Sequence, residues 1–139
     1  MRTQVKYATM LAEKLEQHDA TAWLLNTGWV GGAKGKRCPL KYTRAIVDAI
    51  HSGELAKSGF AKDPIFHLSY PTSCPGVPPE LLDPSASWAD QSEFSSTQTE
   101  LAQLFEKNFT KYAAQASQDV IAQGPSVPAY PVQVKRRKK

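Results

Sequence analysis

The chain has 139 residues, enough for one domain, and a formal net charge of +4 at pH 7. Residues 135–139 are all Lys or Arg, and without them 12 basic residues stand against 13 acidic ones. A body so close to neutral argues against a general nucleic-acid-binding surface. Because no apolar run approaches the ~20 residues that span a membrane, and the N-terminus lacks the apolar segment of a signal peptide, we expect a cytoplasmic protein with no membrane partner.

The first predicted element is an amphipathic helix over residues 2–18, followed by a short apolar strand over residues 22–25. A helix followed directly by a strand suits an α/β layer in which the helix lies on a sheet whose other strands would come from elsewhere. The apolar residues of the helix recur at helical spacing, at Val5, Ala8, Leu11, Ala12 and Leu15.

The predicted strand leads into a glycine-rich loop that carries Lys34, Lys36 and Arg37. Such a loop lets backbone N–H groups approach a ligand, and a helix N-terminus after it favours negative charge. The order indicates anion or nucleotide binding, and a flexible surface loop is an equal alternative. A Walker A motif is excluded because Lys36 is followed by Arg37, where that motif needs Ser or Thr. The glycine spacing of a dinucleotide-binding motif is also absent.

A second helix is predicted from about Pro39, because proline suits the first turn, to a stop at Gly53. Its expected buried stripe is Leu40, Ile46, Ala49 and Ile50. Downstream, alternation predicts a strand over residues 65–70, and proline-rich sequence predicts a loop with one helical turn over 79–82. A third helix is expected over 97–114 and a short one over 117–123. The third helix should bury an apolar stripe formed by Leu101, Leu104, Phe105, Phe109 and Tyr112.

Few side chains outside the loop suggest chemistry. Glu80 and Asp83 could form an acid/base pair, but Asp83 directly precedes a proline and no histidine is nearby, which favours a turn. His67 is predicted to be exposed. Cys38 and Cys74 have no metal-site spacing, so we expect thiols in a reducing compartment.

Residues 126–139 have a different composition, rich in proline and ending in the basic cluster 135–139. We expect this tail to be disordered. The cluster could direct nuclear import or bind nucleic acid, or simply aid solubility. A non-catalytic interaction protein acting through this tail, or a truncated product without function, is therefore an alternative reading of the chain. Deleting residues 135–139 distinguishes the first of these from a nucleotide-binding role. Homo-oligomerisation is compatible with either reading.

Several longer motifs resemble one enzyme family. They are NTGW (26–29), GKR (35–37), KYTRAIVDAIHSGEL (41–55), GVPPELLDP (76–84), LAQLFEKNFTKY (101–112) and AQGP (122–125). Together they resemble the C-terminal part of ATP-dependent phosphoenolpyruvate carboxykinase in its fungal form. The loop GGAKGKR is a couple of residues shorter than the usual fungal pattern. The resemblance implies a mixed α/β fragment of the family's nucleotide-binding domain over 1–125, with a disordered tail over 126–139.

This family of carboxy-lyases converts oxaloacetate and ATP to phosphoenolpyruvate, ADP and carbon dioxide in gluconeogenesis, with Mg²⁺ and Mn²⁺. The resemblance implies that Arg37, Cys38 and Thr43 line the adenine-nucleotide site. The family's P-loop, its metal ligands and its oxaloacetate-binding arginine have no counterpart in these 139 residues. We therefore expect no catalytic or metal-binding residue here, and no activity from the isolated chain.

Overall fold

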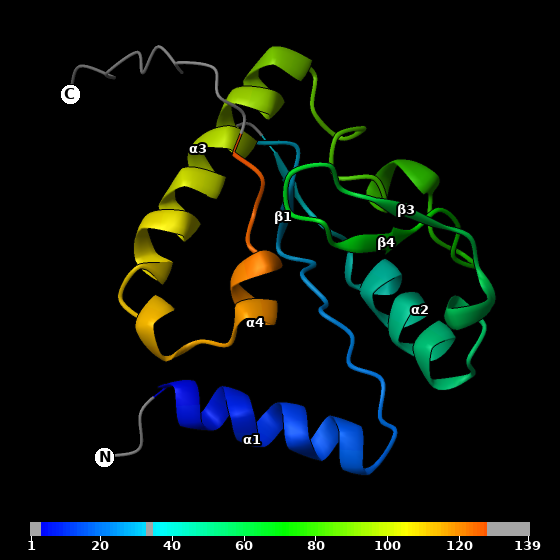
Figure 1. The fold of residues 1–139 in the computed structure, drawn as a ribbon. Helices are drawn as coiled ribbons and strands as arrows, with labels where there is room; N and C mark the ends of the chain where they lie inside the picture. Colours follow the sequence, from blue (N-terminus) through cyan, green and yellow to red (C-terminus); the bar gives the residue numbers. More distant parts are fainter. Residues whose placement is uncertain (1–3, 33–34, 128–139) are drawn as a thin grey trace.

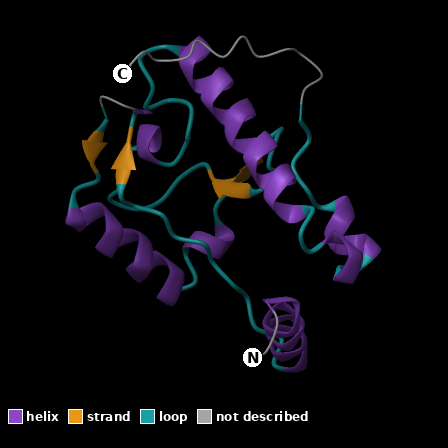
Figure 2. Cartoon of the chain, turned by 90° about the vertical axis from the view of Figure 1, so that its left-hand side faces the viewer, coloured by secondary structure: helices purple, strands orange, loops and turns teal. Residues whose placement is uncertain are grey.

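The structure is a computed structural model that describes residues 4–32 and 35–127. Within these ranges it is mixed α/β, as predicted, with four α-helices and two separate two-stranded antiparallel sheets (Figures 1 and 2). None of the described helices has the length and apolar character needed to cross a bilayer. The helices are α1 (Gln4–Gln17), α2 (Leu40–His51), α3 (Gln91–Phe109) and α4 (Gln118–Ala122). The strands are β1 (Trp29–Val30), β2 (Lys36–Arg37), β3 (Phe60–Lys62) and β4 (Ser69–Pro71). Single 3₁₀ turns, η2 (Leu55–Lys57), η3 (Pro79–Leu81) and η4 (Ala113–Gln115), complete the described elements.

The N-terminal helix α1 is confirmed, whereas its expected position on a sheet with strands from elsewhere stays a prediction. It buries no residue, and the side chains of Tyr7 and Leu11 are 59% and 60% exposed. In Figure 1 it lies at one end of the molecule, joined to the rest by an extended segment. An amphipathic pattern forms a helix locally, but the described part of the chain provides no sheet that covers its apolar stripe.

The prediction of a strand over residues 22–25 is wrong. This segment is extended but unpaired, and Leu24 is 89% exposed. Only Trp23 of these residues packs against the core cluster, and its ring lies 6.2 Å from that of Phe60. The apolar run has the composition of a strand, yet a strand also needs a hydrogen-bonding neighbour, and no described strand lies beside it.

Helix α2 agrees with its predicted bounds and contributes to the small core. Pro39 stands at its N-cap position, and Gly53 follows its C-cap with φ +76°, a left-handed conformation that glycine adopts readily. Its buried residue is Ala49, whereas Leu40, predicted to be buried, is 62% exposed. Ala49 forms the core cluster together with Leu55, Cys74 and Val77.

The strand predicted over residues 65–70 is shortened by a turn at Asp63. One carboxylate oxygen of Asp63 accepts hydrogen bonds from the backbone N–H groups of Ile65 and Phe66, and the other accepts one from Gln98 Nε2. Such local side-chain bonds compete with strand pairing. Only the end of the predicted strand therefore pairs, as β4, with a strand that the sequence did not predict, β3. Buried Asp63 also connects this hairpin to α3.

Helix α3 begins at Gln91, six residues before the predicted start. Asp90 caps it by accepting hydrogen bonds from the N–H groups of Ser92 (2.8 Å) and Glu93 (3.2 Å). The predicted burial of its apolar stripe is wrong for three of the five residues. The buried residues of the helix are Thr99 and Ala102. The exposed fractions are 44% for Leu101, 56% for Leu104 and 56% for Phe105.

The chain returns to the hairpin after the confirmed short helix α4 and the break at Gly124-Pro125. The N–H of Ser126 donates to the carbonyl of Ile65 (2.8 Å), and Ser126 Oγ lies 2.7 Å from His67 Nε2. His67 is half-buried and has φ +58°. The predicted disorder of the tail falls mainly on residues 128–139, which lie outside the described residues.

We expect the isolated chain to be less stable than an ordinary domain of its length. Its sheets have two strands each, and such hairpins are marginal without further partners. Thermal unfolding followed by circular dichroism should show a broad transition below the ~45–65 °C range of mesophile domains. A sharp cooperative transition of the monomer above that range would contradict this expectation. The buried apolar residues in the described ranges are Ala49, Leu55, Ile65, Cys74, Val77 and Ala102.

Candidate nucleotide-binding site

The predicted glycine-rich loop is the turn of a hairpin that delivers the chain to α2. Strand β1 pairs with β2, with Trp29 opposite Arg37. The Cys38 N–H then donates to the Gly28 carbonyl (3.0 Å), which continues the pairing by one step. Pro39 follows at the N-cap of α2. The hairpin therefore places Arg37 and Cys38 directly beside the N-terminus of the helix.

Two glycines allow this hairpin to pack on a distant part of the chain. Gly31 and Gly32 have φ of +91° and +74°, which disfavour side chains. A Cβ added to Gly32 would lie 2.6 Å from the ring of Trp88, and one added to Gly31 would lie 2.8 Å from the carbonyl oxygen of Ser87. Trp88 in turn packs edge-on against Phe94 of α3, with ring centroids 5.6 Å apart. The loop is thus held against the segment that leads into α3.

A pocket of about 470 Å³ opens where β2 meets α2. It contains all three residues that the resemblance assigned to the adenine-nucleotide site, Arg37, Cys38 and Thr43. Its volume is within the roughly 300–1,000 Å³ typical of small-molecule sites. The complete lining is Thr27, Arg37, Cys38, Pro39, Leu40 and Thr43.

The charges around the pocket favour an anionic or electron-rich ligand. The first turn of α2 contains no acidic residue, so its partial positive charge is not neutralised locally. Arg37 is exposed at the pocket, and Lys41, with its Nζ 4.8 Å from the ring centre of Tyr42, is close by in the helix. Lys34, the remaining basic residue of the loop, lies outside the described residues.

Three of the lining residues were not predicted as part of the site, namely Thr27, Pro39 and Leu40. Thr27 comes from the NTGW motif, where Asn26 Oδ1 accepts a hydrogen bond from the Gly28 N–H (3.4 Å) and so bends the chain toward β1. The motif was part of the resemblance, but only the hairpin brings Thr27 to the same pocket as the start of α2. Leu40 was assigned to the core, and its exposure is explained by its position at the pocket.

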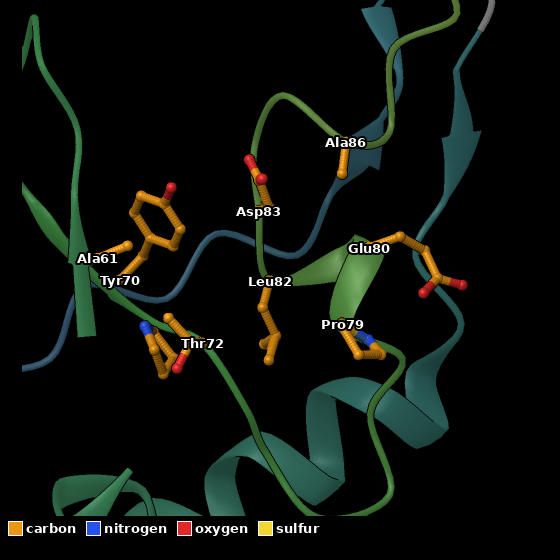
Figure 3. Close-up of a pocket in the computed structure, with 9 residues that line it drawn as sticks. Ala61, Tyr70, Thr72, Pro79, Glu80, Leu82, Asp83 and Ala86 are labelled. Atoms are coloured by element: carbon orange, nitrogen blue, oxygen red, sulfur yellow. The ribbon is translucent and has the colours of Figure 1, made fainter. Parts of the chain in front are cut away.

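A second pocket, of about 480 Å³, lies beside β4 and η3 (Figure 3). Asp83 Oδ1 accepts hydrogen bonds from the N–H and Oγ of Ser85, both 2.8 Å, and these bonds hold the pKa of Asp83 below its ordinary value. Glu80 points away from Asp83 in Figure 3. Burial, followed by the charges of Asp83 and Asp63, raises the pKa of Tyr70. Asp83 is therefore a turn residue, as the sequence favoured, and does not form a pair with Glu80.

Within the described part of the chain, no three residues of the types His, Cys, Asp and Glu are grouped so that they could hold a metal ion. Both cysteines are free thiols, as predicted. Burial, and then the charge of Glu54, raises the pKa of Cys74 above its ordinary value, which suits a structural thiol in the core.

Comparison with known proteins agrees with the resemblance. The family model described as phosphoenolpyruvate carboxykinase matches residues 1–80. Phosphoenolpyruvate carboxykinase (ATP) of Emericella nidulans is 60% identical over 126 residues, which are 88% of this chain and 21% of the relative. The Neurospora crassa protein of the same name is 56% identical over 127 residues, with 88% and 21% covered. That of Saccharomyces cerevisiae is 51% identical over 125 residues, with 87% and 23% covered.

The chain thus spans about a fifth of the length of these curated relatives. The matched region includes the hairpin, the start of α2 and the pocket between them. With more than half of its residues matched by the family model, the chain belongs to the phosphoenolpyruvate carboxykinase family.

Proposed function

We propose that this chain forms the adenine-facing wall of the ATP site in a phosphoenolpyruvate carboxykinase. The reaction would be the conversion of oxaloacetate and ATP to phosphoenolpyruvate, ADP and carbon dioxide, a step of gluconeogenesis in the cytoplasm. The observation that carries the proposal is that one pocket brings together Arg37, Cys38 and Thr43 at the N-terminus of a basic helix.

Each lining residue has a distinct part in this proposal. The planar guanidinium of Arg37 would stack on the base or hold the ribose, since guanidinium groups pair well with flat π systems. The hydroxyl of Thr43, in the first turns of α2, would hydrogen-bond the nucleotide. The backbone at Cys38 would face the adenine edge. Mg²⁺ and Mn²⁺ would be held by residues other than those described here.

The proposal predicts that adenine nucleotide shields Cys38 from alkylation. The measurement uses a chimera, defined as the Emericella nidulans relative with its matched segment replaced by the matched residues of this chain. Saturating ATP should slow iodoacetamide labelling of Cys38, because the bound base covers the pocket that this half-buried thiol lines. Peptide mass spectrometry reports Cys38 and Cys74 separately. Buried Cys74 serves as the internal control, since its labelling should not respond to nucleotide.

Tripolyphosphate distinguishes a base-binding pocket from a phosphate-binding one. It carries the charge of the nucleotide without adenine, so it should leave Cys38 labelling unchanged if the pocket faces the base. Equal shielding by tripolyphosphate and ATP would assign the pocket to the phosphates and contradict the proposed adenine wall. Absence of shielding by ATP at saturation would contradict any nucleotide role for the pocket.

A further inference from the structure

We propose that Trp29 is the base-stacking residue of the nucleotide pocket, with its indole ring lying against the adenine of bound ATP. This inference rests on the proposed adenine wall, and it adds a residue that does not itself line the pocket. In this arrangement Trp29 supplies a flat aromatic surface, and Arg37 beside it supplies the positive charge.

Trp29 stands directly opposite Arg37 in the hairpin, and the hydrogen-bond pattern brings the two side chains close together. The Cys38 N–H donates to the Gly28 carbonyl (3.0 Å), so Gly28 and Cys38 form a hydrogen-bonded pair. Such pairs alternate with non-hydrogen-bonded pairs along an antiparallel ladder, and Trp29 and Arg37 are a pair of the second type. Their Cα atoms are then roughly 4.5 Å apart, and their side chains share one face. Since Arg37 lines the pocket, Trp29 stands at its rim.

The side chain of Trp29 is accessible to a ligand. It is 73% exposed, whereas the other two tryptophans pack on phenylalanine rings, Trp23 on Phe60 and Trp88 on Phe94. Among the described residues, Trp29 has no aromatic partner of this kind. Aromatic side chains carry a large apolar surface, and ligand pockets are commonly lined by them. An exposed tryptophan at the rim of a pocket therefore favours a role in binding a flat ligand.

The pocket needs an aromatic surface from outside its own lining if a base is to stack there. Among its described lining residues there is no Phe, Tyr or Trp. Tyr42 of α2 does not replace Trp29, because it packs against the core cluster and Lys41 Nζ lies 4.8 Å from its ring centre. Nucleobases stack well on aromatic side chains, since every base has a π face. Trp29 is thus the aromatic residue best placed to receive the adenine ring.

Calorimetric titration of the chimera with ATP tests the stacking. Trp29→Leu should weaken ATP binding by about tenfold or more, because it removes the contact between a base and an aromatic ring. Trp29→Phe keeps a ring and should remain within about threefold of the unchanged chimera. Tyr7→Leu is the matched control, since it removes an exposed aromatic side chain from α1, outside the pocket, and should not change the affinity. Affinity for tripolyphosphate, which has no base, should be equal in all four proteins.

Oxidative labelling of the unchanged chimera gives a second readout that does not depend on the folding of a variant. Hydroxyl radicals should modify Trp29 readily in the absence of nucleotide. Saturating ATP should slow this modification severalfold, because the stacked base covers the ring, whereas tripolyphosphate should not. Trp23 and Trp88 serve as internal controls, since each packs on a phenylalanine ring and should not respond to nucleotide. Peptide mass spectrometry measures the three tryptophans separately.

Two results would overturn the inference while leaving the adenine wall intact. One is an equal ATP affinity of Trp29→Leu and the unchanged chimera. The other is a Trp29 that is protected from oxidation before nucleotide is added, which would show that other polypeptide covers the ring. In either case ATP would still shield Cys38 from alkylation, and only the role of Trp29 would be wrong. If ATP shielded neither Cys38 nor Trp29, the adenine wall and the stacking would both be wrong.

Discussion

Arg37→Ala in the chimera is expected to weaken ATP binding by about ten- to a hundredfold. Arg37 ends β2 at the pocket, and a bound nucleotide would partly bury its guanidinium against the base or ribose. Loss of a hydrogen bond to a charged group from such a site costs about 1.5–3 kcal/mol. Thr43→Val should have a smaller effect, since it removes one neutral hydrogen bond worth about 0.5–1.5 kcal/mol and keeps the shape of the side chain. Calorimetric titration with ATP ranks the variants directly.

Lys36→Ala is the matched control for Arg37→Ala. It removes the same charge from the same strand, but successive strand residues point to opposite faces, and Lys36 does not line the pocket. Its expected effect on ATP affinity is small, because an exposed lysine contributes little. If Lys36→Ala weakened binding more than Arg37→Ala, the attraction would come from the general charge of the hairpin, and the specific assignment of Arg37 would be wrong.

Gly32→Ala is expected to destabilise the chain by about 2–4 kcal/mol, through backbone strain and overpacking. The residue has φ +74°, and an added Cβ would lie 2.6 Å from the ring of Trp88. The ring cannot retreat freely, because its other contacts include Phe94 of α3. Urea denaturation followed by tryptophan fluorescence measures the change in the free energy of unfolding. In the chimera the same substitution should also weaken ATP binding, since it displaces the hairpin that positions Arg37.

Gly53→Ala isolates the contribution of Trp88 to this effect. Gly53 has nearly the same backbone conformation, φ +76°, but an added Cβ there meets nothing within 4 Å. It should therefore cost only the backbone term, about 1 kcal/mol. The double variant of Gly32→Ala with Trp88→Ala should be less destabilised than the sum of the two single variants, because the removed ring can no longer collide with the new methyl group. Equal effects of Gly32→Ala and Gly53→Ala would show that the packing on Trp88 is unimportant.

The sequence alone predicted the features that depend on residues close together in the chain. Pro39 and Gly53 marked the ends of α2 correctly because both act through their own backbone conformation. The resemblance assigned Arg37, Cys38 and Thr43 to one site, and the structure brings them together because a strand end and the first turns of a helix are adjacent in sequence. Helix α1 was likewise predictable from its local periodicity.

The tertiary structure alone decided which surfaces are covered. Periodicity shows that the stripe containing Leu101, Leu104 and Phe105 needs a partner, but it cannot show whether this chain provides one, and here the three residues remain largely exposed. The strand positions depended on the turn at Asp63, whose carboxylate joins its own turn to Gln98 far along the chain. The packing of Trp88 on Gly32 likewise joins segments separated by more than fifty residues, and such long-range contacts leave no periodic signal in the sequence.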